Sequence, residues 1–177
     1  MIEVRIHGRG GQGGKTAAQI LARAAYLSGF KTQDFAMYGA ERKGAPVISF
    51  ARIDKDEIRT RGYIFEPDYI VVLDESVDVN KCMKGAKPTT QVIINTKKNY
   101  SGIKNSHTLD ATKVAMEKTG RPIPNVAILG AIVRLFGKKI SFSSLVEAIK
   151  IELSERLSAE VIRKNIEAAK ECFNATN

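Results

Sequence analysis

The stretch IHGRGGQGGKTAAQ, residues 6–19, decides how the fold of this chain begins. Five of the seven residues at 8–14 are glycine. Before them, apolar residues alternate over 2–6, which predicts a strand. After them, apolar residues recur three and four positions apart over 17–27, which predicts an amphipathic helix. A glycine-rich turn between a strand and a helix typically brings backbone amides to a phosphate group.

Beyond this turn, the chain reads first as strands and then as helices. Strands are expected at 30–37, 47–53, 69–73, 91–95 and 106–111, with 58–64 returning as an antiparallel strand after a polar turn. Asp74 directly follows the apolar run at 69–73 and is expected to cap a helix. Helices dominate from Ala111 onward, with an almost wholly apolar one at 125–137.

These patterns predict the fold class and the domain organisation. We expect a three-layer α/β fold with a mixed, mostly parallel sheet, a Rossmann-like start and a helical C-terminal third. The chain shows no linker, repeat or low-complexity run, so residues 1–177 are expected to form a single domain.

The few cysteines and histidines limit the chemistry that this chain performs alone. It has two cysteines, Cys82 and Cys172, and neither belongs to a C-x-x-C pair. We therefore expect buried, reduced thiols and neither an iron–sulfur cluster nor a structural zinc held by this chain. The two histidines, His7 and His107, are also too few for a metal site, and no catalytic residue is assigned.

The formal net charge of +9 arises from 28 Lys and Arg residues against 19 Asp and Glu residues. The basic residues form no run and have no interleaved aromatics, so we expect no nucleic-acid partner; a basic cleft for a polyanionic small molecule or a face for an acidic partner fits as well. No stretch of about 18 apolar residues predicts a membrane span, and the first residues lack the pattern of a secretory leader. A cytoplasmic location is expected.

The glycine loop by itself is compatible with three interpretations. Gly8, Gly10 and Gly13 match the dinucleotide fingerprint G-x-G-x-x-G, with Asp34 near the position of a ribose-binding acid. Residues 13–16 resemble the second half of a nucleotide-triphosphate P-loop, but Arg9 stands where that pattern requires glycine. In the third interpretation, the glycines only let the chain turn tightly against the sheet.

Several blocks in the same order resemble one protein family over roughly residues 2–170. The blocks are HGRGGQGGKTAAQILARAA, YGAERKGAPVISFARI, EPDYIVVLDES and GRPIPNVAILGAI. Together they resemble the gamma subunit, or gamma domain, of 2-oxoacid:ferredoxin oxidoreductases, of which pyruvate:ferredoxin oxidoreductase is the type member. A free-standing NAD-binding protein remains the alternative.

The resemblance implies a role within a larger enzyme. Enzymes of this family oxidatively decarboxylate a 2-oxoacid, transfer the acyl group to coenzyme A and pass electrons to ferredoxin. The complex is expected to use thiamine diphosphate, Mg²⁺ and [4Fe–4S] clusters, on alpha, beta and delta partner subunits. This chain has too few cysteines for a cluster and no Gly-Asp-Gly motif followed by Asn, so it is not expected to bind these groups or to be active alone.

Two loops are the candidate site. The glycine loop could bind the phosphates of coenzyme A through its amides and cations; its candidates are Gly8, Arg9, Gly10, Gly11, Gln12, Gly13, Lys15 and Thr16. A second loop leaves the same sheet edge after the second strand and offers Tyr38, Gly39, Glu41, Arg42 and Gly44. In the alternative, both loops contact a partner subunit, and Arg42 pairs with a carboxylate there.

Three of the neighbouring side chains each have two possible roles. Glu41 could act as a general base, but a local ion pair with Arg42 fits better. His7 is expected to be a hydrogen-bonded structural histidine, with a place in the pocket as the alternative. Tyr38 could contact a ligand or pack at the base of its loop.

Overall fold

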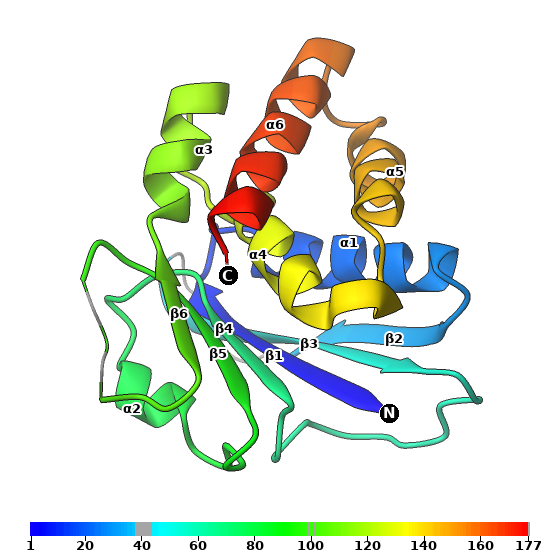
Figure 1. Cartoon of the computed structure of the whole chain (residues 1–177), viewed down its shortest axis with the longest axis vertical. Coiled ribbons are helices and arrows are strands. Elements are labelled where there is room, and N and C mark those ends of the chain that lie inside the picture. The colour runs from blue at the N-terminus through cyan, green and yellow to red at the C-terminus, as the bar shows by residue number, and fades with distance from the viewer. Residues whose placement is uncertain (38–43, 99, 101, 177) are drawn as a thin grey trace.

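The computed structural model of the chain describes residues 1–37, 44–98, 100 and 102–176. These residues form a mixed sheet beneath a group of helices (Figure 1). The strands are β1 (Ile2–Arg9), β2 (Lys31–Ala36), β3 (Pro46–Asp54), β4 (Tyr69–Val72), β5 (Gln91–Asn95) and β6 (Ser106–Leu109). The helices are α1 (Gly14–Leu27), α2 (Val79–Cys82), α3 (Ala111–Thr119), α4 (Ala127–Phe136), the short 3₁₀ turn η1 (Gly137–Lys139), α5 (Phe142–Leu153) and α6 (Ala159–Ala175).

The strand order is β2-β3-β1-β4-β5-β6. Strands β1, β4, β5 and β6 run parallel to one another, whereas β3 is antiparallel to both β1 and β2. The predicted mixed, mostly parallel sheet is therefore confirmed. Because β1 and β2 are both antiparallel to β3, they share one direction, yet β3 separates them.

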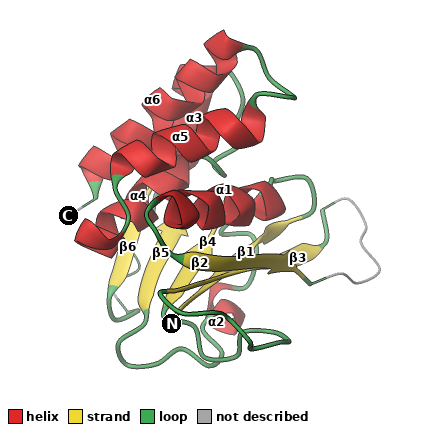
Figure 2. Cartoon of the chain, turned by 90° about the vertical axis from the view of Figure 1, so that its right-hand side faces the viewer, coloured by secondary structure: helices red, strands yellow, loops and turns green. Residues whose placement is uncertain are grey.

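The helices cover the two faces of the sheet unequally. Figures 1 and 2 show α1 and α3–α6 on one face and only α2 on the other. The larger core joins the helical face to the inner side chains of the sheet and includes nearly all of α4, as the apolar sequence of that helix predicts. A smaller core under α2 contains Ile70, Val72, Cys82 and Ile94. The predicted three layers are present, but the third is thin.

The predicted strand at 58–64 is wrong. No strand forms there, and two buried arginines hold this segment instead (Arg5 and Arg52, 7% and 1% exposed). Arg52 Nη2 donates to the carbonyl oxygen of Gly62 at 2.9 Å, and Arg5 Nη1 donates to that of Ile64 at 3.5 Å. Since β3 already pairs with β1 and β2, it has no free edge on which this segment could return as an antiparallel strand.

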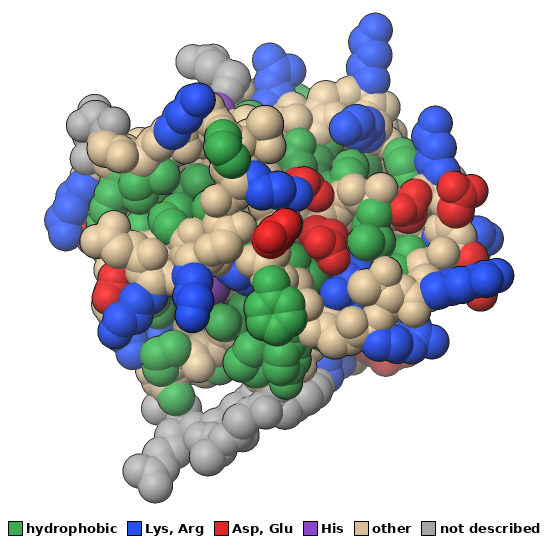
Figure 3. All heavy atoms as spheres, turned by 90° about the horizontal axis from the view of Figure 1, so that it is seen from below, with side chains coloured by type: hydrophobic (Ala, Val, Ile, Leu, Met, Phe, Trp, Pro, Cys, Tyr) green, Lys and Arg blue, Asp and Glu red, His purple; other side chains and the backbone are tan. Residues whose placement is uncertain are grey.

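The face of the sheet opposite the helices carries both signs of charge. Figure 3 shows its basic side chains scattered among acidic, apolar and polar ones, without a continuous basic stripe. Within the described ranges, no helix is both long and apolar enough to cross a membrane.

Helices α4 and α6 cross at a very short distance, which Gly130 permits. A Cβ atom at this position would lie 1.8 Å from the carbonyl oxygen of Ala169 in α6. Ala169 is fully buried, and its backbone is held in the middle of α6. The two helices therefore meet only because position 130 has no side chain.

We predict that Gly130→Ala destabilises the fold by about 1–3 kcal/mol, although alanine favours helices, because the added methyl group forces α4 and α6 apart. Urea unfolding of the purified chain measures this change. The matched control is Gly102→Ala, since a Cβ at position 102 meets no atom within 4 Å. An equal effect of both substitutions would contradict the close-packing argument.

Candidate functional site

The glycine loop lies at the sheet edge where parallel strands end. It follows β1, and the ends of β4 and β5 lie beside it because these strands are parallel to β1. A cavity of about 630 Å³ opens at this edge. It is lined by Gln12, Leu73, Asp74, Glu75, Asn95, Thr96, Lys97, Asp110, Thr112, Lys113, Met116, Glu117, Pro122 and Pro124; we call it the edge cavity.

Arg9 ties the loop to two neighbouring segments. Its Nε donates to Ser76 Oγ at 2.6 Å, and its Nη2 donates to the Ser76 carbonyl oxygen at 2.7 Å. Its Nη1 donates to the carbonyl oxygen of Gly44 at 2.9 Å. The guanidinium is thus engaged by protein acceptors and holds the loop in place.

Gln12 connects the loop to the end of β4. Its Oε1 accepts from the backbone amide of Arg9 at 2.7 Å, and its Nε2 donates to Asp74 Oδ2 at 2.5 Å. A Cβ atom on Gly8, the next-to-last residue of β1, would lie 3.1 Å from Gln12 Oε1 and 3.2 Å from Leu73 Cδ1, so glycine there allows Gln12 and Leu73 to pack closely. Gln12 is the one loop side chain that also lines the edge cavity.

Asp74 does not cap a helix, contrary to the prediction. Helix α2 begins five residues later, and Asp78 caps it by accepting from the amide of Lys81. Burial opposes ionisation of Asp74, but hydrogen bonds from Ser76 and Gln12, together with the charge of Arg9, lower the pKa of its carboxyl below the ordinary value. The carboxylate therefore stays charged and accepts a hydrogen bond from Gln12 of the glycine loop.

Helix α1 begins directly at the loop. Its N-cap is Gly13, in the left-handed region at φ 75°, and no side chain caps the first turn. Asn125 Nδ2 donates to the Gly13 carbonyl oxygen at 3.3 Å and lies where a Cβ atom on Gly13 would be. Lys15 and Thr16 fall in this first turn, which contains no acidic residue. The turn thus presents backbone amides, the positive end of the helix dipole and Lys15.

The second candidate loop is described only at its end. Gly44 donates its amide to the carbonyl oxygen of Gly10 at 3.3 Å, and Gly10 donates to that of Ala45 at 2.8 Å. The glycine loop and the end of the second loop are therefore in contact. Tyr38, Gly39, Glu41 and Arg42 lie outside the described residues. A Cβ atom added to Gly11, whose φ is 96°, would meet no atom within 4 Å.

Sequence reasoning missed the polar side chains at the carboxyl end of β5, Asn95 and Thr96. Asn95 Nδ2 donates to the Leu73 carbonyl oxygen and to Thr112 Oγ1, both at 2.7 Å, and Thr96 donates to Glu75. Their position at the carboxyl end of a parallel strand was the available signal, because ligands in such sheets bind at that end. The site is therefore wider than its two predicted loops.

His7 lies beneath the loop and is structural, as predicted. It is 7% exposed, and its Nε2 accepts from Arg5 Nε at 3.0 Å. Burial, followed by the positive charge of Arg5, lowers the pKa of His7 to about 4. The ring is consequently neutral near pH 7, with Nε2 as an acceptor.

The cysteines are buried and lie apart. Cys82 belongs to the small core under α2, and Cys172 to the core on the helical face of the sheet. Burial raises the pKa of Cys82 to about 11 and that of Cys172 to about 12, so both are thiols at neutral pH. In the described ranges, no group of three or more His, Cys, Asp or Glu side chains is placed to hold a metal ion.

Asp34 is in the wrong place for a dinucleotide site. The fingerprint requires the second strand beside the first, whereas β3 lies between β1 and β2 in this sheet. Asp34 instead lines a small cavity at the sheet edge with Arg23, Thr32 and Glu152. The free-standing NAD-binding alternative is not favoured.

These features define an α/β domain with a polar cavity at the carboxyl end of its parallel strands. The family model described as pyruvate ferredoxin/flavodoxin oxidoreductase matches residues 3–175, and the chain belongs to this family. The predicted resemblance is thus confirmed.

Named relatives match almost the whole chain. Pyruvate synthase subunit PorC of Methanothermobacter thermautotrophicus is 45% identical, covering 98% of this chain and 94% of the relative. The common gamma subunit of the pyruvate/ketoisovalerate oxidoreductases of Pyrococcus furiosus is also 45% identical, with coverages of 99% and 97%. The crystal structure of pyruvate oxidoreductase subunit PORC from Thermotoga maritima matches with a TM-score of 0.84 at 32% identity, covering 98% and 95%.

A larger solved enzyme shares the fold. The 2-oxoglutarate:ferredoxin oxidoreductase from Magnetococcus marinus, with 2-oxoglutarate, coenzyme A and succinyl-CoA bound, matches with a TM-score of 0.79 at 22% identity. The match covers 99% of this chain and 31% of the longer one. The fold of a separate subunit in one protein thus occurs as part of a longer chain in another.

We predict that the stability of the chain falls as the pH drops from about 6.5 to about 4. The unfolded state takes up a proton on His7 in this window, whereas the folded state does not, and the loss amounts to about 3 kcal/mol. His7→Gln keeps an acceptor for Arg5 and should flatten this slope in urea unfolding across pH. His107→Gln is the control, and an unchanged slope in His7→Gln would refute the assignment.

We also predict that Gly13→Ala costs more stability than Gly11→Ala. Both residues have left-handed backbones, but only a side chain at position 13 meets Asn125, with its Nδ2 at 2.2 Å. Gly11→Ala should cost about 1 kcal/mol, and Gly13→Ala about 1–3 kcal/mol more, in urea unfolding. Asn125→Ala should recover part of this added loss in the Gly13→Ala background. Equal losses at both glycines would show that Asn125 is irrelevant.

Proposed function

We propose that this chain is the gamma subunit of a pyruvate:ferredoxin oxidoreductase. Such a complex oxidatively decarboxylates pyruvate, forms an acyl-CoA and carbon dioxide, and transfers the electrons to ferredoxin. The 45% identity to PorC over nearly the whole chain supports this assignment. A relative of equal identity is named as common to pyruvate and ketoisovalerate oxidoreductases. We infer that other subunits choose the 2-oxoacid.

The redox cofactors are assigned to partner subunits. A [4Fe–4S] cluster requires four thiolates, and the two thiols of this chain are buried on opposite faces of the sheet. The residues present thus do not fit a cluster. The sequence also lacks the Gly-Asp-Gly motif expected for thiamine diphosphate and its Mg²⁺. Alpha, beta and delta subunits are the proposed partners that carry these groups, and the proposed location of the complex is the cytoplasm.

The glycine loop is proposed to contact coenzyme A. The observation that carries this proposal is the start of α1, where a glycine N-cap, the lack of a side-chain cap and the lack of acidic residues leave the first turn ready for an anion. Lys15 in that turn is exposed and supplies a positive charge. A solved family member whose fold the chain shares contains bound coenzyme A, which agrees with this proposal.

The edge cavity suits the uncharged polar part of the same ligand. Gln12, Asn95 and Thr96 present amide and hydroxyl groups to it, as a ligand rich in amides and hydroxyls requires. Four acidic and two basic side chains line it, so it has no excess of positive charge to attract phosphates. We therefore place the phosphates at α1 and the neutral part in the edge cavity.

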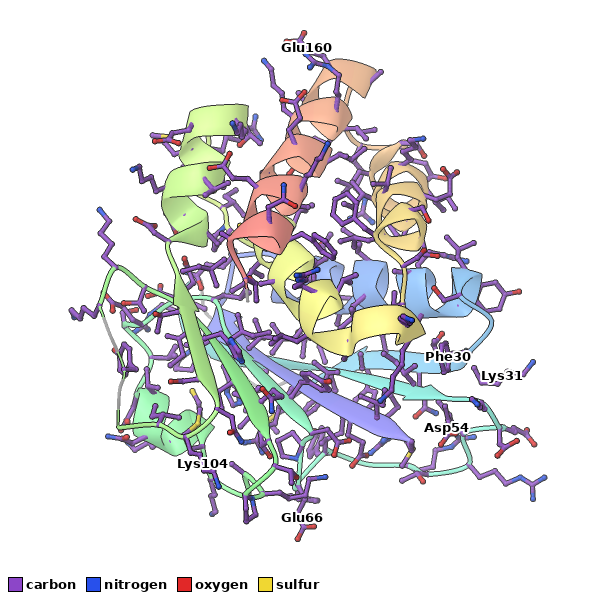
Figure 4. All side chains as sticks on the ribbon, in the orientation of Figure 1. Phe30, Lys31, Asp54, Glu66, Lys104 and Glu160 are labelled. Carbon is purple, nitrogen blue, oxygen red and sulfur yellow. The ribbon has the colours of Figure 1, made fainter. Side chains whose placement is uncertain are left out.

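We predict that Lys15→Ala in the assembled complex raises the KM for coenzyme A about 10-fold or more, because a charge-assisted contact to phosphate is lost, while assembly and the KM for the 2-oxoacid stay normal. Steady-state kinetics with varied coenzyme A measures this change. The control is Lys31→Ala, since Lys31 lies at the opposite end of the sheet, beside Asp54 (Figure 4).

Loss of assembly in Lys15→Ala, with an unchanged KM for coenzyme A in any residual complex, would instead identify the loop as a subunit interface. Arg42→Ala extends the same comparison to the second loop. Activity of the isolated chain on a 2-oxoacid would refute the role of a subunit.

A further inference from the structure

A second cavity lies on the other side of the segment 121–125, the connection between α3 and α4. This segment separates the two cavities and contributes side chains to both. Pro122 and Pro124 line the edge cavity, whereas Arg121, Ile123 and Asn125 line the second one. The second cavity has a volume of about 200 Å³; we call it the arginine cavity.

Apolar side chains from three helix ends form the wall of the arginine cavity. Val126 precedes α4, Leu153 ends α5, and Leu157 and Val161 come from the turn into α6 and from its first turn. Val126 and Leu153 are buried, Leu157 and Val161 are partly buried, and Ile123 at the rim is 39% exposed. An apolar group that enters here is removed from water, which favours binding.

Two guanidinium groups and no carboxylate line the same cavity. Arg121 comes from the segment 121–125 and Arg156 from the turn between α5 and α6. Neither guanidinium has a hydrogen-bond or ion-pair partner in the described part of the chain. Glu160 lies at the outer tip of α6 (Figure 4) and pairs with Lys164 Nζ at 2.7 Å. The arginine cavity is thus electropositive, whereas four acids line the edge cavity.

The start of α1 adds to this positive potential. Thr16, in the first turn of α1, also lines the arginine cavity. The amides of this turn have no acceptor within the helix, and the helix dipole favours an anion beside them. Asn165, which also lines the cavity, donates from its Nδ2 to the Val161 carbonyl oxygen at 2.9 Å.

We infer that the arginine cavity is a second ligand site, for a small anion whose carboxylate or phosphate group is joined to an apolar or planar body. The arginines bind the anionic group, and the apolar wall receives the body. Its 200 Å³ is below the roughly 300–1,000 Å³ typical of drug-sized ligands, so it accommodates a body of about six to ten non-hydrogen atoms. This inference does not depend on the proposed function.

Phenyl phosphate, which combines a planar body with an anion, is the probe. In NMR titration of the full chain, we expect saturable shifts at Val126, Leu157 and Val161. Arg121→Gln combined with Arg156→Gln should weaken the binding at least about 10-fold, because two charge-assisted contacts are lost. The matched control is Arg163→Gln, since Arg163 is exposed on α6, pairs with Glu167 and does not line the cavity.

No saturable binding up to 10 mM phenyl phosphate, or equal binding to the double variant, would overturn the inference. Equal binding of inorganic phosphate would also overturn it, because the apolar wall would then contribute nothing. Competition with adenosine 3′,5′-bisphosphate identifies the source of the anion. Displacement assigns the site to the nucleotide end of a coenzyme, and its absence assigns the site to a free organic acid or phosphate ester.

Discussion

The pairing of β1 on both sides is the constraint on which the rest of the structure depends. β1 is antiparallel to β3 over eight residue pairs and parallel to β4 on its other side. This position fixes where the chain leaves the sheet, after Arg9, and the glycine loop turns there. The parallel partner brings Asp74 beside that turn, so that Gln12 can bridge it to the backbone of Arg9. The shape of the site thus follows from the direction of the strands.

The other face of the sheet is organised by buried charge. Arg52 pairs with Glu3 at 2.9 Å, whereas Arg5 donates mainly to carbonyl oxygens, with 2.6 Å to that of Cys82 and 2.7 Å to that of Lys84. Burying a guanidinium is unfavourable unless its donors are satisfied, and several carbonyl groups satisfy these. The same bonds supply partners to the irregular segments 60–65 and 82–84. On this face, the hydrogen bonds of the two arginines therefore hold irregular segments against the sheet.

The site itself divides into regions of different polarity. The edge cavity is polar and acidic, the start of α1 offers amides and a cation, and the arginine cavity is apolar with two guanidinium groups. The segment 121–125 separates the two cavities, and Asn125 fastens it to Gly13. In the proposed function, this chain contributes to catalysis by holding a ligand that partner subunits use.

The sequence by itself determined the order and type of most elements, because the alternation of strands and the spacing of helices are local properties. The four sequence blocks that resemble the family, and the low number of cysteines, could likewise be recognised from the sequence alone. Only the tertiary structure decided that β3 inserts between β1 and β2, that 58–64 forms no strand, and that Asp74 serves the loop. It also brought Asn95, Asn125 and Arg156 to the site. These outcomes depend on which strand edges are already occupied and on partners distant in sequence, and no local pattern carries that information.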